Sequence, residues 1–172
     1  IGEIFHINPV TARLMRNRGL TTVGEMQRYL YGSLSNLYDS HLLKDADKGA
    51  EIIKEKIETG KKIRIISDYD VDGVSSNYIL YQGLKRCGAD VDYKIPDRVE
   101  DGYGINEHLI EKAAEDGIDT IITCDNGIAA AEQIAYGNSL GLTLIVTDHH
   151  DIPFQRQEDG SISYNLPSAA AV

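Results

Sequence analysis

The chain has 172 residues, 42% of them hydrophobic and 26% charged, which is enough for one domain with a hydrophobic core and a small helical addition. Its 17 basic and 27 acidic residues leave a net charge of −10, which argues against a general nucleic-acid coat protein, because such proteins need a basic surface. No apolar run approaches the roughly 20 residues of a membrane span, and the first residues lack the pattern of a secretory signal. The two cysteines are too few for a disulfide framework. We therefore predict a cytoplasmic protein.

Residues 1–60 have the pattern of helices. Residues 11–18 can form a short helix that ends at a glycine, and Thr22 and Glu25 have the spacing of a capping box at the start of a second helix. Residues 46–58 carry apolar side chains at helical spacing. We predict a small helical N-terminal region over residues 1–60 that covers the domain behind it.

From residue 61 to residue 172 strands and helices alternate. The expected strands are 63–66, 91–95, 120–123 and 142–147, and the expected helices are 75–86, 106–115 and 129–140. The strands are rich in Ile, Val and Leu with little polar alternation, which indicates burial on both faces. We therefore predict an α/β domain over residues 61–172, with a parallel sheet and helices on both of its faces. Ligands of such sheets bind beyond the carboxyl ends of the strands.

Acidic residues stand directly after three of the predicted strands. The fold would gather Asp68, Asp70, Asp72, Asp125 and Asp148 at one edge, together with His149 and His150. Close carboxylates repel one another by several kcal/mol unless a cation or a proton neutralises them. Carboxylates with imidazoles suit Mn²⁺, Mg²⁺ or Fe²⁺, whereas zinc is less favoured because no cysteine pair is placed to bind it.

Each of these features also has a purely structural explanation. An Asp after a strand is often a helix N-cap, which Asp72 could be for the helix 75–86, and Asp125-Asn126-Gly127 is a good turn signal. Their joint occurrence at three strand ends favours a metal site.

Ordered motifs make the sequence resemble a known family. They are Ser67–Gly73, Ile95–Arg98 with Asp101–Gly104, Thr123–Ile128 and Val146–His150. They resemble the DHH phosphoesterase superfamily, which is named for a triplet that stands here as Asp148-His149-His150. The segment Asp101–Gly104 makes the chain similar, within that superfamily, to the RecJ family of single-strand-specific 5′→3′ DNA exonucleases. Residues Asn8-Pro9 and Arg18-Gly19-Leu20 fit the same family, so the resemblance covers nearly the whole chain.

The resemblance implies a site with two Mn²⁺ or Mg²⁺ ions. The implied metal ligands are Asp70, Asp72, Asp125 and His149. Asp125 would bridge the two ions, and Asp68 would have a catalytic role in or beside the metal site. Two such ions hydrolyse a phosphodiester by activating a water and stabilising charge on the phosphoryl oxygens.

The resemblance also implies roles for three residues around the ions. His150 would contact the scissile phosphate, and Asp148 would orient the histidines through a hydrogen bond. Arg98 is a candidate phosphate contact, because a guanidinium group matches phosphate oxygens. An ordinary surface ion pair of Arg98 with Glu100 or Asp101 stays open as the alternative.

The implied function is exonuclease activity on single-stranded DNA in repair and recombination, with a single-strand-binding protein and a helicase as partners. The family has a further metal-binding Asp and a C-terminal nucleic-acid-binding domain beyond the triplet. This chain stops at Val172, so we expect an N-terminal fragment with little or no activity alone.

Three alternatives use the same residues differently. The first is another DHH enzyme, an oligoribonuclease or a cyclic-dinucleotide phosphodiesterase. The second is a phosphatase similar to the haloacid dehalogenases, with Asp70 as nucleophile and Asp72 as acid, which leaves Asp125 and both histidines without roles. The third is a DHH scaffold without catalysis in replication or repair, although the metal motifs here are intact.

Overall fold

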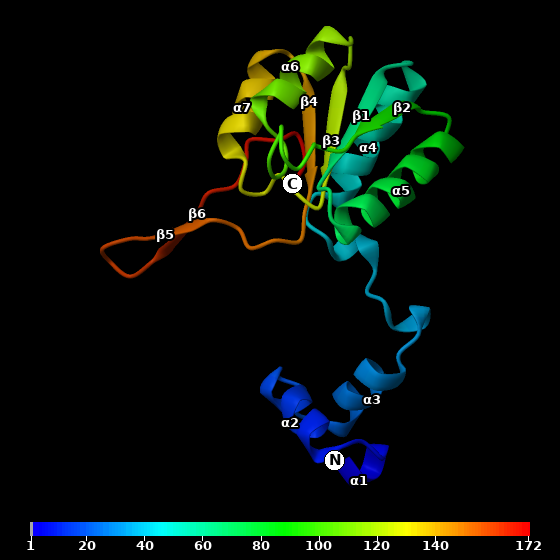
Figure 1. The fold of residues 1–172 in the computed structure, drawn as a ribbon, viewed down its shortest axis with the longest axis vertical. Coiled ribbons are helices and arrows are strands. Elements are labelled where there is room, and N and C mark those ends of the chain that lie inside the picture. Colours follow the sequence, from blue (N-terminus) through cyan, green and yellow to red (C-terminus); the bar gives the residue numbers. More distant parts are fainter. Residues whose placement is uncertain (1) are drawn as a thin grey trace. The chain divides into compact units, whose positions relative to one another are not determined.

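The computed structural model describes residues 2–172, and the chain divides into two compact units, Ile1–Leu42 and Leu43–Val172. The first unit, blue in Figure 1, is helical. It contains α1 (Gly2–Phe5), α2 (Pro9–Asn17), α3 (Val23–Tyr31) and the 3₁₀ turns η1 (Leu34–Asn36) and η2 (Ser40–Leu42). Phe5, Met15 and Met26 form its small core.

Side-chain caps determine where these helices begin. The capping box predicted from the spacing of Thr22 and Glu25 is present at the start of α3. The Glu25 N–H donates to Thr22 Oγ1 at 3.2 Å, and the Thr22 N–H donates to Glu25 Oε2 at 2.8 Å. At the start of α2, the Val10 N–H donates to Asn8 Oδ1 at 2.8 Å. Each bond satisfies a backbone donor near a helix start that would otherwise lack a partner.

The second unit is built on a parallel sheet, as the sequence predicts. Its strands are β1 (Lys62–Ser67), β2 (Asp90–Lys94), β3 (Thr120–Cys124) and β4 (Thr143–Thr147), in the order β2-β1-β3-β4. The helices are α4 (Ala46–Glu58), α5 (Val71–Arg86), α6 (Glu107–Glu115) and α7 (Ala131–Ser139). Figure 1 shows α6 and α7 on one side of the sheet and α4 and α5 on the other. The predicted α/β fold with helices on both faces is confirmed.

The strands bury both faces because alternate side chains point to opposite helix layers. Ile121 and Leu144 pack with Leu109 and Ile110 of α6. The neighbouring Ile122 of β3 belongs to the other cluster, beneath α4 and α5. Helix α4 lies within the predicted N-terminal region but packs in this second unit, and the division of the chain at residue 60 stays a prediction.

Some predicted details differ from the structure. Strand β2 lies at the sheet edge, so four of its residues are exposed rather than buried. Helix α5 begins four residues earlier than predicted, because Asp70 caps it. A hairpin of β5 (Phe154–Arg156) and β6 (Ile162–Tyr164) was not predicted, since each of its strands has only 3 residues. No helix within residues 2–172 is long and apolar enough to cross a membrane.

Arg64 of β1 joins the edge strand to α6, and its loss should weaken the sheet. Its Nε and Nη2 donate to the two carboxylate oxygens of Asp92 at 2.8 and 2.7 Å, and its Nη1 donates to Asp116 at 2.9 Å. We expect Arg64→Met, which keeps an apolar stem, to lower the free energy of unfolding by about 1–2 kcal/mol, because both carboxylates are partly solvated. Urea unfolding measures this. Lys54→Met is the control, because the 3.9 Å pair of Lys54 with Glu58 is exposed, and an equal loss there would contradict the role of Arg64.

Candidate metal centre

The register of the sheet brings three acidic residues to one edge. Ser67 pairs with Cys124, and Cys124 pairs with Thr147, so β1, β3 and β4 end in the same row. The residues that directly follow this row are Asp68, Asp125 and Asp148. Three separate parts of the sequence therefore bring carboxylates to the same edge of the sheet.

Two groups of possible metal ligands form at this edge and share one carboxylate. Ligand atoms of Asp68, Asp70 and Asp125 lie within 4.8 Å of one another, and so do ligand atoms of Asp125, His149 and His150. Asp125 is the shared member and is buried. Its Oδ1 lies 2.8 Å from His149 Nε2. This arrangement is compatible with the bridging position that the resemblance implies for Asp125.

The backbone after β3 is shaped to present Asp125. Asp125 has a φ of 61°, which few residues other than Gly, Asn and Asp adopt. Two residues later Gly127 has a φ of 107°, and a Cβ there would lie 2.7 Å from Thr123 Oγ1. The turn signal in the sequence is thus real, and it positions the acid as well as turning the chain.

Two carboxylate oxygens in this cluster are buried without a hydrogen-bond donor. Among the described residues, Asp68 Oδ1 and Asp125 Oδ2 have no partner. A buried charged oxygen without a partner costs free energy that a protein normally avoids. A divalent cation would satisfy both oxygens, and carboxylates with imidazoles are ligands that Mn²⁺ and Mg²⁺ accept. The residues present therefore fit a metal centre.

The electrostatics of the cluster divide its carboxylates into two kinds. Burial raises the pKa of Asp125, and the neighbouring carboxylate of Asp70 raises it further. The pKa of Asp70 is lowered, chiefly because the backbone N–H of Gly73 donates to it. Asp70 is thus stabilised as an anion by the start of α5, whereas the surroundings of Asp125 disfavour its charged form in the absence of a cation.

Asp148 and His150 form a tight pair beside this cluster. His150 Nδ1 lies 2.7 Å from Asp148 Oδ1, and this bond raises the pKa of His150. Burial disfavours the charged form of Asp148, yet hydrogen bonds from Ile128 N–H and from His150 hold the pKa of Asp148 below its usual value. Asp148 contacts the histidine as the resemblance implies, and the other ring nitrogen of His150 lies 3.4 Å from Tyr103 Oη.

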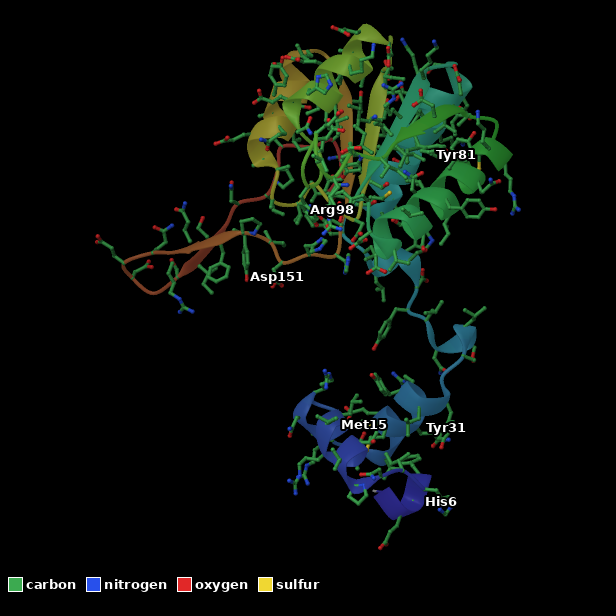
Figure 2. All side chains as sticks on the ribbon, viewed as in Figure 1. His6, Met15, Tyr31, Tyr81, Arg98 and Asp151 are labelled. Carbon is green, nitrogen blue, oxygen red and sulfur yellow. The ribbon has the colours of Figure 1, made fainter. Side chains whose placement is uncertain are left out.

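Arg98 is connected to the site by contacts between aromatic side chains. Its guanidinium group lies 5.2 Å from the centre of the Tyr69 ring, and Tyr69 contacts Tyr103 edge-on at 6.4 Å. Figure 2 shows Arg98 near the end of the sheet where the loop to Asp151 begins. No ion pair of Arg98 is found within residues 2–172.

Asp72 is the one predicted ligand that stands apart from both groups. It is exposed in the first turn of α5, and its N–H donates to Asp70 Oδ1 at 2.9 Å. Asp70, rather than Asp72, is the N-cap of the helix, because Asp70 Oδ1 also accepts from the Gly73 N–H at 3.0 Å. The role of Asp72 as a metal ligand stays a prediction.

Asn126 is a site residue whose contacts the sequence did not reveal. Its side chain is buried and donates to Ile66 O at 3.1 Å and to Cys124 O at 3.0 Å. Its Oδ1 accepts from the Ile105 N–H at 3.2 Å, in the loop that carries Tyr103. The turn signal placed Asn126 beside the site, but no sequence pattern indicates that it joins two strand ends to a distant loop.

A cavity opens beside His150. Its volume is about 450 Å³, and its lining includes Tyr103, Asn106, Gln133, Asp148 and His150. Sites for small ligands commonly have volumes of about 300–1,000 Å³. The cavity has room for part of a nucleotide next to the candidate metal ligands.

Comparison with known proteins finds a family match and similar sequences. Residues 62–172 match the DHH family, N-terminal domain. The single-stranded-DNA-specific exonuclease RecJ of Bacillus subtilis is 39% identical over 149 residues, which are 87% of this chain and 19% of that protein. The chain thus spans about a fifth of the length of this curated relative.

Solved structures show the same likeness. One is exonuclease RecJ bound to manganese, with 31% identity, a TM-score of 0.65, and coverage of 78% of this chain and 32% of that chain. Another is RecJ of Thermus thermophilus in complex with Mn²⁺, with 26% identity, a TM-score of 0.62, and coverage of 85% and 20%. Both neighbours hold manganese, which is a metal that suits the ligand groups found here.

Proposed function

The chain belongs to the DHH family, and from this premise we propose that the whole protein is a metal-dependent phosphodiesterase that degrades single-stranded DNA from its 5′ end. The observation that carries the proposal is the pair of ligand groups that share Asp125, with unpartnered buried oxygens on Asp68 and Asp125. The choice of single-stranded DNA as the substrate is supported by the relative from Bacillus subtilis, which is named a single-stranded-DNA-specific exonuclease, and by the structural neighbour, which is named an exonuclease.

The two ligand groups give each residue a distinct task. Asp68, Asp70 and Asp125 would hold one ion, and Asp125, His149 and His150 would hold or face the second. Two divalent ions would neutralise the phosphoryl oxygens and lower the pKa of the attacking water. Asp72 stays a further candidate ligand.

Around the metal site, three side chains would bind and orient the phosphate. Asp148 fixes the ring of His150 through its Nδ1, so that Nε2 faces the site and, when protonated, donates to a phosphate oxygen. Arg98 would bind a phosphate through two parallel N–H groups. Because its contact is with the Tyr69 ring rather than with a carboxylate, the guanidinium group need not break an ion pair to do so.

The test is a cleavage assay with the whole protein and Mn²⁺. We expect single-stranded DNA to be shortened from the 5′ end, with little cleavage of duplex DNA. Preference for short RNA or for a cyclic dinucleotide would instead support the other DHH activities. Metal binding without any cleavage would support the scaffold alternative. A single-strand-binding protein and a helicase as partners, a role in DNA repair and recombination, and a cytoplasmic location are parts of the same proposal.

The proposed metal site predicts a pH dependence. The pKa of His150 is raised by its bond to Asp148 and lies above the ordinary 6.5, and the pKa of Asp125 is raised by burial. Protonation of Asp125 would remove a metal ligand, and protonation of His150 would place a positive charge beside the ions. We therefore expect Mn²⁺ affinity to fall by up to about tenfold per pH unit for each proton displaced as the pH drops below the pKa of His150. Calorimetry of the chain across this range measures the effect. In Asp148→Asn the fall should begin at a lower pH, and a flat profile would contradict the assignment.

A further inference from the structure

Charge is distributed unevenly between the two units of the chain. Residues 1–42 contain no lysine, and their four arginines outnumber Glu3, Glu25 and Asp39, which gives a net charge of +1. Since the whole chain carries −10, residues 43–172 carry −11. Of the two units of this chain, the first is therefore the one whose net charge does not repel a polyanion.

The four arginines of this unit are exposed, and the described residues offer them no partner. They are Arg13, Arg16, Arg18 and Arg28. No hydrogen bond or ion pair joins any of these guanidinium groups to another side chain in the described residues 2–172. The nearby acid Glu25 is held elsewhere, because its Oε2 accepts from the Thr21 and Thr22 N–H groups at 2.9 and 2.8 Å. The guanidinium groups are thus free to bind an anion.

The helix geometry places the arginines away from the core of the unit. Arg13 and Arg16 are three residues apart on α2 and so share a face, while Met15 of the same helix is buried. On α3, Met26 is buried and Arg28 is exposed. Figure 2 shows nitrogen-tipped side chains projecting from this unit, with Met15 between the helices. The core therefore does not need the charges for packing.

Exposed aromatic rings lie on the same helix as Arg28. Tyr29 and Tyr31 of α3 are each 65% exposed. Surfaces that bind single strands combine cationic groups along the backbone with aromatic rings on which unpaired bases stack. A duplex offers its phosphates but not the faces of its bases, so the combination favours a single strand.

We propose that the N-terminal unit binds the sugar-phosphate backbone of single-stranded nucleic acid through Arg13, Arg16, Arg18 and Arg28, called here the arginine surface. The proposal rests on the proposed function for the identity of the nucleic acid. Guanidinium groups match phosphate oxygens with two parallel hydrogen bonds. The arginine surface would retain the strand independently of any metal.

The salt dependence of binding tests this proposal. Each phosphate neutralised on a single strand adds about −0.7 to the slope of log affinity against log salt concentration. Four contacts predict a slope of about −2.8, so binding should weaken about 50-fold between about 50 and about 200 mM salt. The measurement is the fluorescence anisotropy of labelled oligothymidylate with the 172-residue chain in EDTA, where no metal-dependent cleavage occurs.

Matched variants separate the effect of where the positive charges lie from the effect of the net charge of the chain. One variant changes the four residues of the arginine surface to Gln. The control changes the exposed Lys48, Lys54, Lys85 and Arg86 to Gln, so that both variants have a net charge of −14. We expect the first to lose most of the salt slope and more than about tenfold in affinity at low salt, and the control to keep the wild-type slope. A third variant with Lys at the four arginine positions keeps the charge and should keep the slope, which shows that the first result is not misfolding.

Several outcomes would overturn the proposal. They are no binding of oligothymidylate by the wild-type chain at low salt, equal losses of affinity in the two Gln variants, or preferential binding of anionic lipid vesicles through the same arginines.

The variant Tyr29→Ser supplies an independent signature. Loss of stacking should weaken binding without changing the salt slope, and a changed slope would count against a role of Tyr29 in stacking. Binding in EDTA does not depend on the metal site. Salt-dependent binding by a protein that fails to cleave single-stranded DNA would contradict the exonuclease proposal alone, whereas unchanged binding in the Gln variant of the arginine surface would contradict this proposal alone.

Discussion

Replacement of Asp125 by Asn is expected to remove Mn²⁺ binding at both ligand groups at once. Asp125 is the carboxylate that the two groups share, so neither group keeps its full set. Loss of a residue that only supports a metal ligand costs about 10–100-fold in affinity, and loss of a shared ligand should therefore exceed about 100-fold. Calorimetric titration of the chain with Mn²⁺ measures the loss.

Asn is the informative substitution because it preserves the local structure. Asn tolerates the φ of 61° at this position, and its carbonyl oxygen can still contact His149. The pKa of Asp125 is raised by burial and by Asp70, so the charge is a burden in the metal-free chain. We therefore expect the thermal stability of Asp125→Asn in EDTA to equal or exceed that of the wild type, which separates ligand loss from misfolding.

Asp151→Asn is the matched control, since this exposed acid follows the histidine pair and belongs to neither ligand group. It should bind Mn²⁺ as the wild type does. Retention of two ions with wild-type affinity in Asp125→Asn would contradict the shared-ligand interpretation. An equal loss in Asp151→Asn would show that net charge, rather than coordination, governs binding.

The location of the site could be predicted from the sequence because parallel sheets impose it. Apolar strands that run directly into Asp68, Asp125 and Asp148 leave little freedom, since the carboxyl ends of parallel strands meet at one edge. The register then brings these residues into neighbouring rows. The fold could be predicted for a similar reason, because buried strands that alternate with helices have few arrangements other than a parallel sheet between helix layers.

The fine geometry could not be predicted because it depends on competing local contacts. Asp70 and Asp72 are both acids near the start of one helix, and either could cap it. In the structure the N–H of Asp72 itself donates to Asp70, which selects Asp70 as the cap and leaves Asp72 exposed. The contacts of Asn126 were equally hidden, because they join Ile66 and Ile105, which are 60 and 21 residues away.

Gly73 in the first turn of α5 is a position where a very small substitution should be strongly destabilising. A Cβ there would lie 2.3 Å from the carbonyl oxygen of Asp68 and 2.6 Å from its carbonyl carbon. Backbone atoms cannot rotate away, so the helix start or Asp68 must move. We expect Gly73→Ala to lower the free energy of unfolding by about 3 kcal/mol and to weaken Mn²⁺ binding, because Asp68 and Asp70 flank the displaced turn.

The same substitution elsewhere in α5 should have the opposite effect, and this comparison isolates the clash. Gly83 lies in the same helix and is exposed, and a Cβ at this position would have no atom within 4 Å. Ala is preferred over Gly in a helix by about 1 kcal/mol, so Gly83→Ala should stabilise the chain by up to that amount and leave Mn²⁺ binding unchanged. Urea unfolding and calorimetry of both variants make the test. If Gly73→Ala proved as stable as Gly83→Ala, the close approach of α5 to Asp68 would not exist in solution, and the ligand group of Asp68, Asp70 and Asp125 would lose its structural basis.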